Sequence, residues 1–438
     1  MNKQARKSNR KKLFYISAHF PPCGASGVYR TLGFLEFLVP LGWSVRVLAI
    51  KNIREERNDP KLLQQIPHGV KVIRTGYIDL FSLKPQRTGQ KKISGAGTTK
   101  NDRPSSVRVD SVFSRIRESI SYLLKTPDSY PGWIPVGLLR AVASTRPDVI
   151  LATAPPFSSL ILGVLLKKIW RRPLVIDLRD PWCHNPFRLQ RPAMADSFDR
   201  FLERWVFRHA DHVLMNTEEA CRLYQEQYPA YQEKISVLTN GFSPVIKRQT
   251  LAADKKYFDG PWIVHVGALY GKRSPKELIA ASRGMHGIII DLYGPGTQQY
   301  HDAARGTPVR LHPPVPHERA IILQQQADIT LVIGNCMNGS VQIPAKIYEA
   351  MAVAGQLWLI DTDDSPTGKL LLNHGIPHFF SCNRADSIKV TLQKIKNDYR
   401  NSPLPAGIDA SLTAPFQRAR LTRELDNILA ALMPYSEV

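Results

Sequence analysis

The sequence predicts an α/β protein built from two successive, doubly wound domains with parallel sheets. The chain has 438 residues, which is too many for one ordinary core and suits two domains of about 200 residues each. Short apolar runs alternate with helix-length segments, and this alternation is typical of βαβ units. The alternation starts afresh at Trp262, which indicates a second domain of the same kind.

The N-terminal domain is predicted over residues 12–243. A strand over 13–17, a turn rich in proline and glycine, a helix over about 29–39 and a strand over 43–50 make one βαβ unit. Further strands are expected over 71–74, 148–152, 174–178, 212–215 and 235–238, and helices from Ser158 and over about 195–207. Residues 84–108 hold few apolar side chains and are therefore predicted to be a mobile basic loop.

The C-terminal domain is predicted over residues 255–415, after a hinge at 240–244. Strands are expected over 262–266, 287–292, 329–333 and 357–360, and helices over 275–283, up to 327, and over 343–353. Ser274 is expected to cap the first of these helices, with Pro275 in its first turn. The amphipathic segment 416–432 is predicted to be a helix and is a candidate to pack back on the N-terminal domain.

The charge balance favours an anionic partner. There are 59 Lys and Arg against 37 Asp and Glu, a formal net charge of +22. Membrane phospholipid, nucleic acid and acidic glycan all fit this excess, and plain solubility through basic loops is the alternative. We expect no nucleic-acid partner, because the chain has no aromatic-interleaved basic motif, no P-loop and no zinc pattern.

The cysteines and the lengths of the apolar runs predict in which cellular compartment the protein is found. The chain has five cysteines, which is an odd number, and none of them forms a CxxC motif. Neither a zinc site nor a disulfide framework is therefore indicated. No run has the length of a signal peptide or a membrane span. We therefore expect a cytoplasmic protein that is soluble or peripheral to the membrane.

Two glycine-containing turns could hold phosphate groups. Gly24 and Gly27 lie between the first strand and a helix, where freed backbone amides can cradle an anion; a tight turn is the alternative. This turn lacks the GxGxxG pattern, and no acidic residue ends the second strand, so a dinucleotide cofactor is disfavoured. In the second domain the corresponding turn adds Lys272 and Arg273, which could grip a diphosphate or be a solvated surface pair.

The segment 343–355 offers the most informative pattern. Pro344 is expected where the helix begins, so that Lys346 and Glu349 project from one face of its first turns. The carboxylate could accept hydrogen bonds from two ribose hydroxyls while the lysine meets the phosphate of the same nucleotide. The alternative is an ordinary surface ion pair of little energetic value.

Several of these segments together resemble the retaining glycosyltransferases of family four. The similar segments span nearly the whole chain and are residues 13–27, 239–242, 267–275, 293–296 and 346–352. The resemblance implies the GT-B fold, in which two Rossmann-like domains face each other across an interdomain cleft that holds a nucleotide sugar. It implies that Glu349 holds the ribose and that Arg273 and Lys346 neutralise the leaving diphosphate, with Gly294 as a further donor-binding candidate.

The sequence departs from the family at one position. The family often has a second glutamate eight residues before the first, near the donor sugar, where this chain has Val341. Residues 177–182 resemble an Arg-Asp-x-Trp signature, and within them Asp180 could orient the acceptor; a salt bridge with Arg179 or a loop cap is the alternative. His19 and His184 lie near these motifs, and a lone histidine is more often structural.

The expected function is metal-independent transfer of a hexosyl group from a nucleotide sugar to a hydroxyl. Asp180, Arg273 and Lys346 are the catalytic candidates, the donor sugar is a co-substrate, and no metal or other cofactor is expected. By resemblance the reaction retains configuration, and the acceptor is a cell-envelope glycan or a lipid-linked saccharide in polysaccharide biosynthesis. The basic residues of 3–12 and 84–108 could dock to an anionic membrane. The alternative is a non-catalytic nucleotide- or glycan-binding protein of the same fold.

Overall fold

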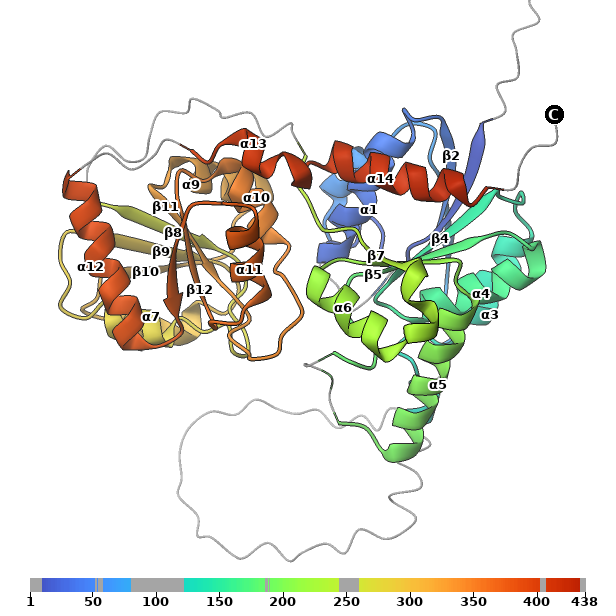
Figure 1. The fold of residues 1–438 in the computed structure, drawn as a ribbon, viewed down its shortest axis with the longest axis horizontal. Helices are drawn as coiled ribbons and strands as arrows, with labels where there is room; N and C mark the ends of the chain where they lie inside the picture. Colours follow the sequence, from blue (N-terminus) through green and yellow to red (C-terminus); the bar gives the residue numbers. More distant parts are fainter. Residues whose placement is uncertain are drawn as a thin grey trace, which may run out of the picture.

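The computed structural model describes residues 10–51, 53, 58–79, 122–185, 188, 190–243, 260–401 and 407–433. These residues form two α/β domains that lie side by side along the long axis of the molecule (Figure 1). Each domain has a parallel sheet with helices packed against it, so the predicted fold class is confirmed. The predicted basic loop over 84–108 and the basic residues before Arg10 lie outside the described residues.

The N-terminal sheet has the strand order β3-β2-β1-β4-β5-β6-β7. Its strands are β1 (Lys11–Ile16), β2 (Trp43–Ile50), β3 (Lys71–Thr75), β4 (Val149–Ala154), β5 (Leu174–Leu178), β6 (His212–Met215) and β7 (Ile235–Val237). Strand β1 lies between β2 and β4, with Leu13 opposite both Val45 and Val149. The order reverses direction at β1 and β4, and ligands of doubly wound sheets bind at such a switch point.

Helices cover both faces of this sheet. They are α1 (Ser26–Leu38), α3 (Trp133–Val142), α4 (Ser158–Trp170), α5 (Ala193–His209) and α6 (Glu218–Gln227), with the short 3₁₀ helices η1 (Pro60–Gln65) and η2 (Pro229–Lys234). Helix α1 begins at Ser26, three residues before the predicted start. Helix α6 was not predicted, although Thr217 caps it by accepting a hydrogen bond from the Ala220 amide at 3.1 Å.

The C-terminal sheet has the order β10-β9-β8-β11-β12-β13. Its strands are β8 (Trp262–Val266), β9 (Ile289–Tyr293), β10 (Val309–His312), β11 (Ile329–Ile333), β12 (Leu357–Asp361) and β13 (His378–Cys382). The two edge strands, β10 and β13, were not predicted. Both are short and incompletely buried: only Val309 is buried in β10, and β13 alternates buried with partly exposed residues, so their apolar signal is weak.

Two predictions about the helices of the C-terminal domain differ from the structure, namely where α10 begins and which residue caps α7. The helices are α7 (Lys276–Ala281), α8 (His301–Ala304), α9 (His317–Gln326), α10 (Lys346–Val353), α11 (Pro366–Asn373), α12 (Ala385–Asn401) and α13 (Ala410–Thr413), with η3 (Gln298–Tyr300) and η4 (Ala414–Phe416). The predicted start of α10 at 343 is wrong, because Ile343 and Pro344 are buried in a turn that precedes the helix. Ser274 is not the cap of α7, since Pro275 holds that position.

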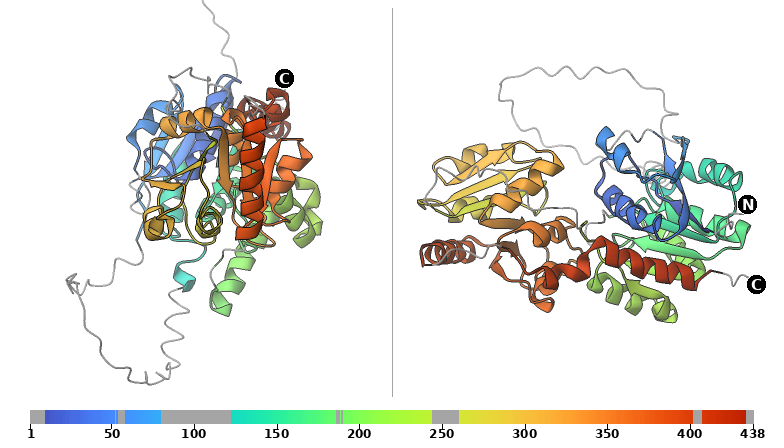
Figure 2. Two further views of the ribbon diagram at one scale, coloured as in Figure 1. Left: turned by 90° about the vertical axis from the view of Figure 1, so that its left-hand side faces the viewer. Right: turned by 90° about the horizontal axis from the view of Figure 1, so that it is seen from above.

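The chain crosses between the domains twice, and the two crossings lie together. The amide of Phe242 donates to the carbonyl of Phe416 at 3.0 Å, and the amide of Arg418 donates to Phe242 at 2.9 Å. Helix α14 (Arg418–Ala431) then runs along the N-terminal domain and buries Leu425 and Leu429 beside α1 (Figures 1 and 2). The end of the chain therefore belongs to the core of the domain in which the chain began.

Candidate active site

Two adjoining cavities lie between the domains. The larger has a volume of about 680 Å³ and the smaller about 280 Å³. Both are lined by the start of α1 on the N-terminal side and by the start of α10 on the C-terminal side, where Lys346 contacts both. Backbone amides at helix N-termini favour anions. The cavities together form the interdomain cleft.

Lys346, the first residue of α10, lies against a buried histidine. Its Nζ is 3.3 Å from Nε2 of His265, whose Nδ1 is 3.0 Å from the carbonyl oxygen of Leu331. A carbonyl only accepts, so Nδ1 carries the proton and Nε2 accepts from the lysine. Burial, with the charges of Lys346 and Arg273, lowers the pKa of His265 well below its usual range. Burial and the charge of Arg273 lower the pKa of Lys346 to about 7.

Arg273 is held by neutral groups in the larger cavity. Its Nε donates to Oδ1 of Asn335 at 2.9 Å, and its Nη1 donates to the hydroxyl of Tyr270 at 3.1 Å. The guanidinium also lies over the Tyr270 ring, 5.2 Å from the ring centroid. Lys272 lines the same cavity and is exposed. Neither cation is within ion-pair distance of a described carboxylate, so both remain available to an anion.

Gly24 and Gly27 both reach the cleft, but Gly27 has a function that the sequence did not reveal. Gly24 lines the smaller cavity and Gly27 the larger. A Cβ at Gly27 would lie 0.8 Å from Nη1 of Arg179, so only glycine lets that guanidinium lie on α1. Arg179 lines the larger cavity too, and its Nε donates to the Ala154 carbonyl at 3.2 Å. Gly27 therefore admits a fourth cation beside Lys272, Arg273 and Lys346.

Gly27→Ala is expected to displace Arg179 from the cleft and to lower nucleotide affinity about tenfold, the effect of losing one charge-assisted contact. Isothermal titration with uridine and guanosine diphosphates measures this. Gly76→Ala is the matched control, because no atom lies within 4 Å of a Cβ at that position. Equal affinities for the two variants would contradict the assignment.

Gly267 leaves room for the side chain of Lys346, and Gly294 leaves room for the backbone of Gly267. A Cβ at Gly267, where φ is +157°, would lie 2.3 Å from Nζ of Lys346. A Cβ at Gly294 would lie 2.1 Å from the carbonyl oxygen of Gly267. Gly294 lines neither cavity, so the structure places this predicted donor-site residue one layer behind the site.

Glu349 lines the smaller cavity beside two cationic groups. Its Oε2 is 3.0 Å from Nε2 of His317, and its Oε1 is 3.9 Å from Nη2 of Arg418. Burial opposes the charge of Glu349, but the hydrogen bond from His317 and the charges of His317 and Arg418 outweigh it and keep its pKa below the ordinary value. No ion pair joins Glu349 to Lys346, so the simple surface pair considered above is wrong.

The partners of Glu349 come from both domains. Arg418 begins α14, and a Cβ at Gly33 of α1 would lie 2.5 Å from its Cδ. The ring of His317 lies 5.6 Å from that of Tyr29 on α1, centroid to centroid. Neither residue was predicted from the sequence, because His317 reaches Glu349 through the packing of α9 on α10, and Arg418 reaches it where the chain returns to the N-terminal domain.

Asp180 reaches the cleft from the loop after β5. Its Oδ1 accepts a hydrogen bond from Nε2 of Gln342 at 2.8 Å, and this bond spans the two domains. Burial raises the pKa of Asp180, against the charges of Arg179 and Arg273. The alternative salt bridge with Arg179 does not form, since that side chain donates to the carbonyls of Ala154 and Pro155.

Val341 makes a contact between the two domains. The carbonyl of Val341 accepts a hydrogen bond from Oγ1 of Thr217 at 2.7 Å, and its side chain packs against the N-terminal core. Position 341, where the family often has a glutamate, thus makes an interdomain contact in this chain. His19 and His184 line neither cavity and are packed edge-on against tyrosine rings.

Nucleotide affinity is expected to fall as the pH rises above 7. The pKa of free Lys346 is about 7, and a bound diphosphate favours the charged lysine, so binding above pH 7 takes up a proton. The terminal phosphate is already ionised there, because its pKa is about 6. The dissociation constant should rise by up to about tenfold per pH unit, the limit for one linked proton.

Titration calorimetry in two buffers of different ionisation enthalpy measures this proton. Lys346→Arg keeps a charge that does not titrate. The variant therefore separates the proton of Lys346 from that of His317, whose pKa is raised by the hydrogen bond to Glu349. Equal proton uptake by the variant and the unmodified protein would contradict the prediction.

The sequence is similar to those of known glycosyltransferases. Residues 28–241 match the glycosyl transferase 4-like domain. A D-inositol 3-phosphate glycosyltransferase from Nocardiopsis dassonvillei is 28% identical over 227 residues, which are 45% of this chain. That match spans about half of the relative, 52% of its length.

Solved structures show similarity over the whole chain. HepE from Anabaena, solved in complex with UDP and glucose, has a TM-score of 0.65 at 15% identity and covers 96% of this chain and all of its own. Sucrose-phosphate synthase from Thermosynechococcus elongatus has a TM-score of 0.62 at 15% identity, covering 97% of this chain and 99% of its own. At such identities the likeness shows the fold. The domain match, the relative and these folds all support a glycosyltransferase: residues 28–241 are similar to the glycosyl transferase 4-like domain, and the two domains have the GT-B fold.

Proposed function

We propose that this protein transfers a hexosyl group from a nucleotide sugar to a hydroxyl group of a cell-envelope glycan or lipid-linked saccharide. One observation carries the proposal. Four cations, Arg179, Lys272, Arg273 and Lys346, line one cavity, and none forms an ion pair with a carboxylate in the described parts of the chain. Such a set of cations fits a diphosphate, whose fixed negative charge would supply the anionic partner that these side chains do not have within the protein.

Each part of the donor has a place in the cleft under this proposal. The diphosphate lies between the starts of α1 and α10, against Lys346 and Arg273. The ribose lies in the smaller cavity, where Glu349 accepts hydrogen bonds from its hydroxyls. The sugar lies in the larger cavity near Asp180 and Gln342, which share a hydrogen bond between the two domains.

The reaction breaks the bond between the anomeric carbon and the diphosphate oxygen. A bond from the acceptor oxygen to that carbon forms, and the hydroxyl proton passes to the departing diphosphate. Lys346 and Arg273 stabilise the charge that develops on the leaving group, without a metal ion. Asp180 orients the acceptor. Retention of configuration is carried over from the resemblance to family four.

A thermal-shift screen with uridine, guanosine, adenosine and thymidine nucleotides and their sugar conjugates tests the proposal first, because a ligand stabilises the state that binds it. Release of nucleoside diphosphate is then followed with each donor that binds. We expect binding and slow hydrolysis with one nucleobase, and the loss of both in Arg273→Ala. Binding without release from any donor would instead indicate a non-catalytic nucleotide-binding protein.

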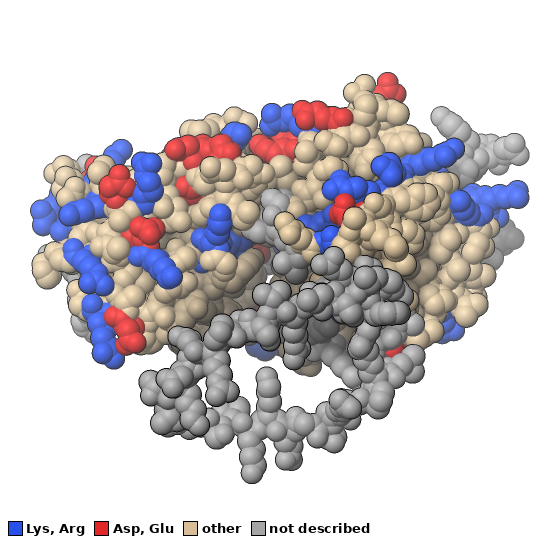
Figure 3. All heavy atoms as spheres, turned by 90° about the horizontal axis from the view of Figure 1, so that it is seen from below, with Lys and Arg blue, Asp and Glu red and all other residues tan. Residues whose placement is uncertain are grey.

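The proposal includes peripheral association with the inner face of the cytoplasmic membrane, where lipid-linked acceptors are found. None of the helices that the structure describes combines the length and the apolar character needed to cross a bilayer. Lys and Arg side chains are spread over both domains on the face shown in Figure 3. The charge alone therefore does not single out a membrane-binding surface.

A further inference from the structure

Helix α5 buries two carboxylates and exposes three large apolar side chains near its start, while Val206 and Phe207 near its end are buried in the ordinary way. Asp199 and Glu203 are 1% and 0% exposed, whereas Met194, Phe198 and Phe201 are 63%, 39% and 53% exposed. A surface helix normally has the opposite arrangement, with apolar residues facing the core. The helix also projects from the rest of the N-terminal domain (Figure 1).

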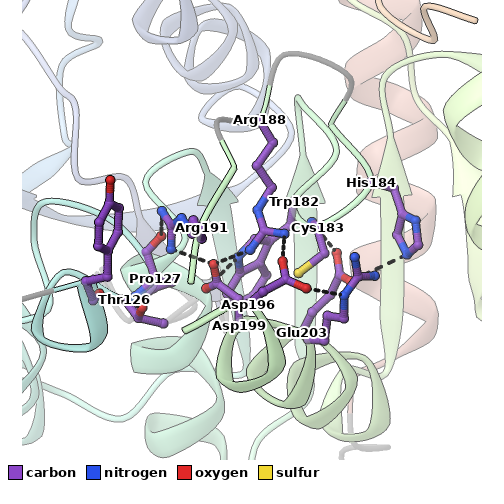
Figure 4. Close-up of polar contacts among 12 residues, drawn as sticks. Thr126, Pro127, Trp182, Cys183, His184, Arg188, Arg191, Asp196, Asp199 and Glu203 are labelled. Carbon is purple, nitrogen blue, oxygen red and sulfur yellow. Dashed lines mark hydrogen bonds and ion pairs between the residues drawn. The ribbon is translucent and has the colours of Figure 1, made fainter. Parts of the chain in front are cut away.

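A buried polar network fixes this orientation (Figure 4). Oδ2 of Asp199 accepts hydrogen bonds from Arg188 and Arg191, each at 2.6 Å. Oε1 of Glu203 accepts from the hydroxyl of Tyr224 at 2.6 Å and from the amide of Cys183 at 3.1 Å. Turning the helix to hide its apolar face would break these bonds and leave the buried Tyr224 hydroxyl and Cys183 amide without acceptors. The outward apolar face is therefore a built feature of the domain.

The three exposed apolar residues form one continuous stripe with Trp205, which is partly buried against the N-terminal core. Met194, Phe198, Phe201 and Trp205 follow one another at spacings of four, three and four residues, which places them on one face of the helix. The rings of Phe198 and Phe201 stack with centroids 6.3 Å apart. We call these four residues the docking stripe.

Cations border the docking stripe. Arg204 and Arg208 are exposed on α5, and Nζ of Lys168 on α4 lies 5.1 Å from the centroid of the Trp205 ring. None of these three cations is in an ion pair with a carboxylate of the described ranges. Asp196 is the remaining acid of the helix, and it is already paired with Arg188 and Arg200. The stripe and its border thus combine apolar and positively charged chemistry.

We propose that the docking stripe and its three cations bind the surface of an anionic phospholipid bilayer, with α5 lying in the plane of the interface. Aromatic and aliphatic side chains enter the boundary between headgroups and acyl chains, and arginine and lysine pair with the headgroups. This surface supplies the specific membrane contact that net charge alone does not identify. It does not depend on the transfer reaction, so either proposal can fail alone.

The docking surface is connected to the cleft by a short loop. The loop begins at Asp180, and Asn185 in its middle lines the larger cavity. Arg188, three residues later, is paired with Asp196 and Asp199 in the first turns of α5. A bilayer against α5 would therefore present a lipid-linked acceptor on the side of the molecule from which this loop enters the cleft.

Flotation of the full chain with vesicles tests the proposal. Vesicles of phosphatidylcholine alone are compared with vesicles in which about a third of the lipid is phosphatidylglycerol. We expect at least about tenfold tighter binding to the anionic vesicles, weakened by high salt. Phe198→Ser with Phe201→Ser should lower that affinity about tenfold or more, and Arg204→Gln with Arg208→Gln should lower it by a similar factor.

Leu372→Ser with Val390→Ser is the matched control, because these residues are 71% and 66% exposed on the C-terminal domain. The control should bind anionic vesicles like the unmodified protein. Equal binding of the phenylalanine variant and the control would overturn the proposal. A lower melting temperature in the phenylalanine variant alone would also overturn the proposal. The same holds if light scattering shows a dimer that this variant dissociates, since either result means that protein covers the docking stripe. Nucleotide binding by thermal shift should be unchanged in every variant.

Discussion

Replacing Lys346 with methionine is expected to lower turnover by about 10²- to 10³-fold while making the unliganded protein more stable. The loss of turnover follows from removing a preorganised cation at the leaving group. The gain in stability follows from the pKa of Lys346, which is about 7 in the folded protein against an ordinary value of 10.5. The charged lysine therefore destabilises the fold below pH 7, and this penalty declines as the pH rises from 7 toward 10.5.

Thermal denaturation at about pH 6 measures the stability effect, and we expect the melting temperature to rise by about 2 °C or more. Lys272→Met is the matched control, since Lys272 lines the same cavity but is exposed. The control should lose less than about tenfold in turnover and should not gain stability. A destabilised Lys346→Met protein with normal turnover would show that the lysine is a structural residue.

Replacing Glu349 with glutamine is expected to raise the KM for the donor about 10- to 100-fold. Hydrogen bonds from ribose hydroxyls to a carboxylate contribute about 1.5–3 kcal/mol each, and an amide keeps only part of this. The turnover number should change less, because the ribose is held equally in the ground state and the transition state. Initial rates over a range of donor concentrations separate the two constants.

A nucleotide analogue makes the test of Glu349 specific. A 2′,3′-dideoxynucleoside diphosphate should bind the unmodified protein about as weakly as the natural nucleotide binds Glu349→Gln, and the variant should not discriminate between the two. Glu318→Gln, an exposed neighbour of His317, is the control and should behave like the unmodified protein. If Glu349→Gln still preferred the ribonucleotide, another residue would hold the ribose.

The candidate residues that follow a local pattern could be picked out from the sequence. Lys346 and Glu349 share the first turns of α10, and Arg273 lies in the turn after β8 and Gly267. Local spacing and charge made all three candidates, and the resemblance to family four favoured them over surface ion pairs. Topology was predictable for a related reason, because buried parallel strands are continuous apolar runs. The edge strands β10 and β13 lacked such runs and were missed.

The parts that depend on tertiary contacts could not be predicted. His265 lies in the buried apolar strand β8 and becomes a partner of Lys346 only because the fold brings the start of α10 beside it. Arg179 enters the cleft because Gly27, on a distant segment, leaves room for it. Arg418 reaches Glu349 because α14 returns to the N-terminal domain. No short-range pattern contains these pairings.

A crystal structure of the protein with uridine or guanosine diphosphate, whichever the thermal-shift screen selects, tests the central claim most directly. We expect the diphosphate within hydrogen-bonding distance of Nζ of Lys346 and the guanidinium of Arg273, and the ribose hydroxyls against Glu349. A nucleotide bound outside the interdomain cleft, or bound there with its phosphates turned away from these cations, would contradict the account.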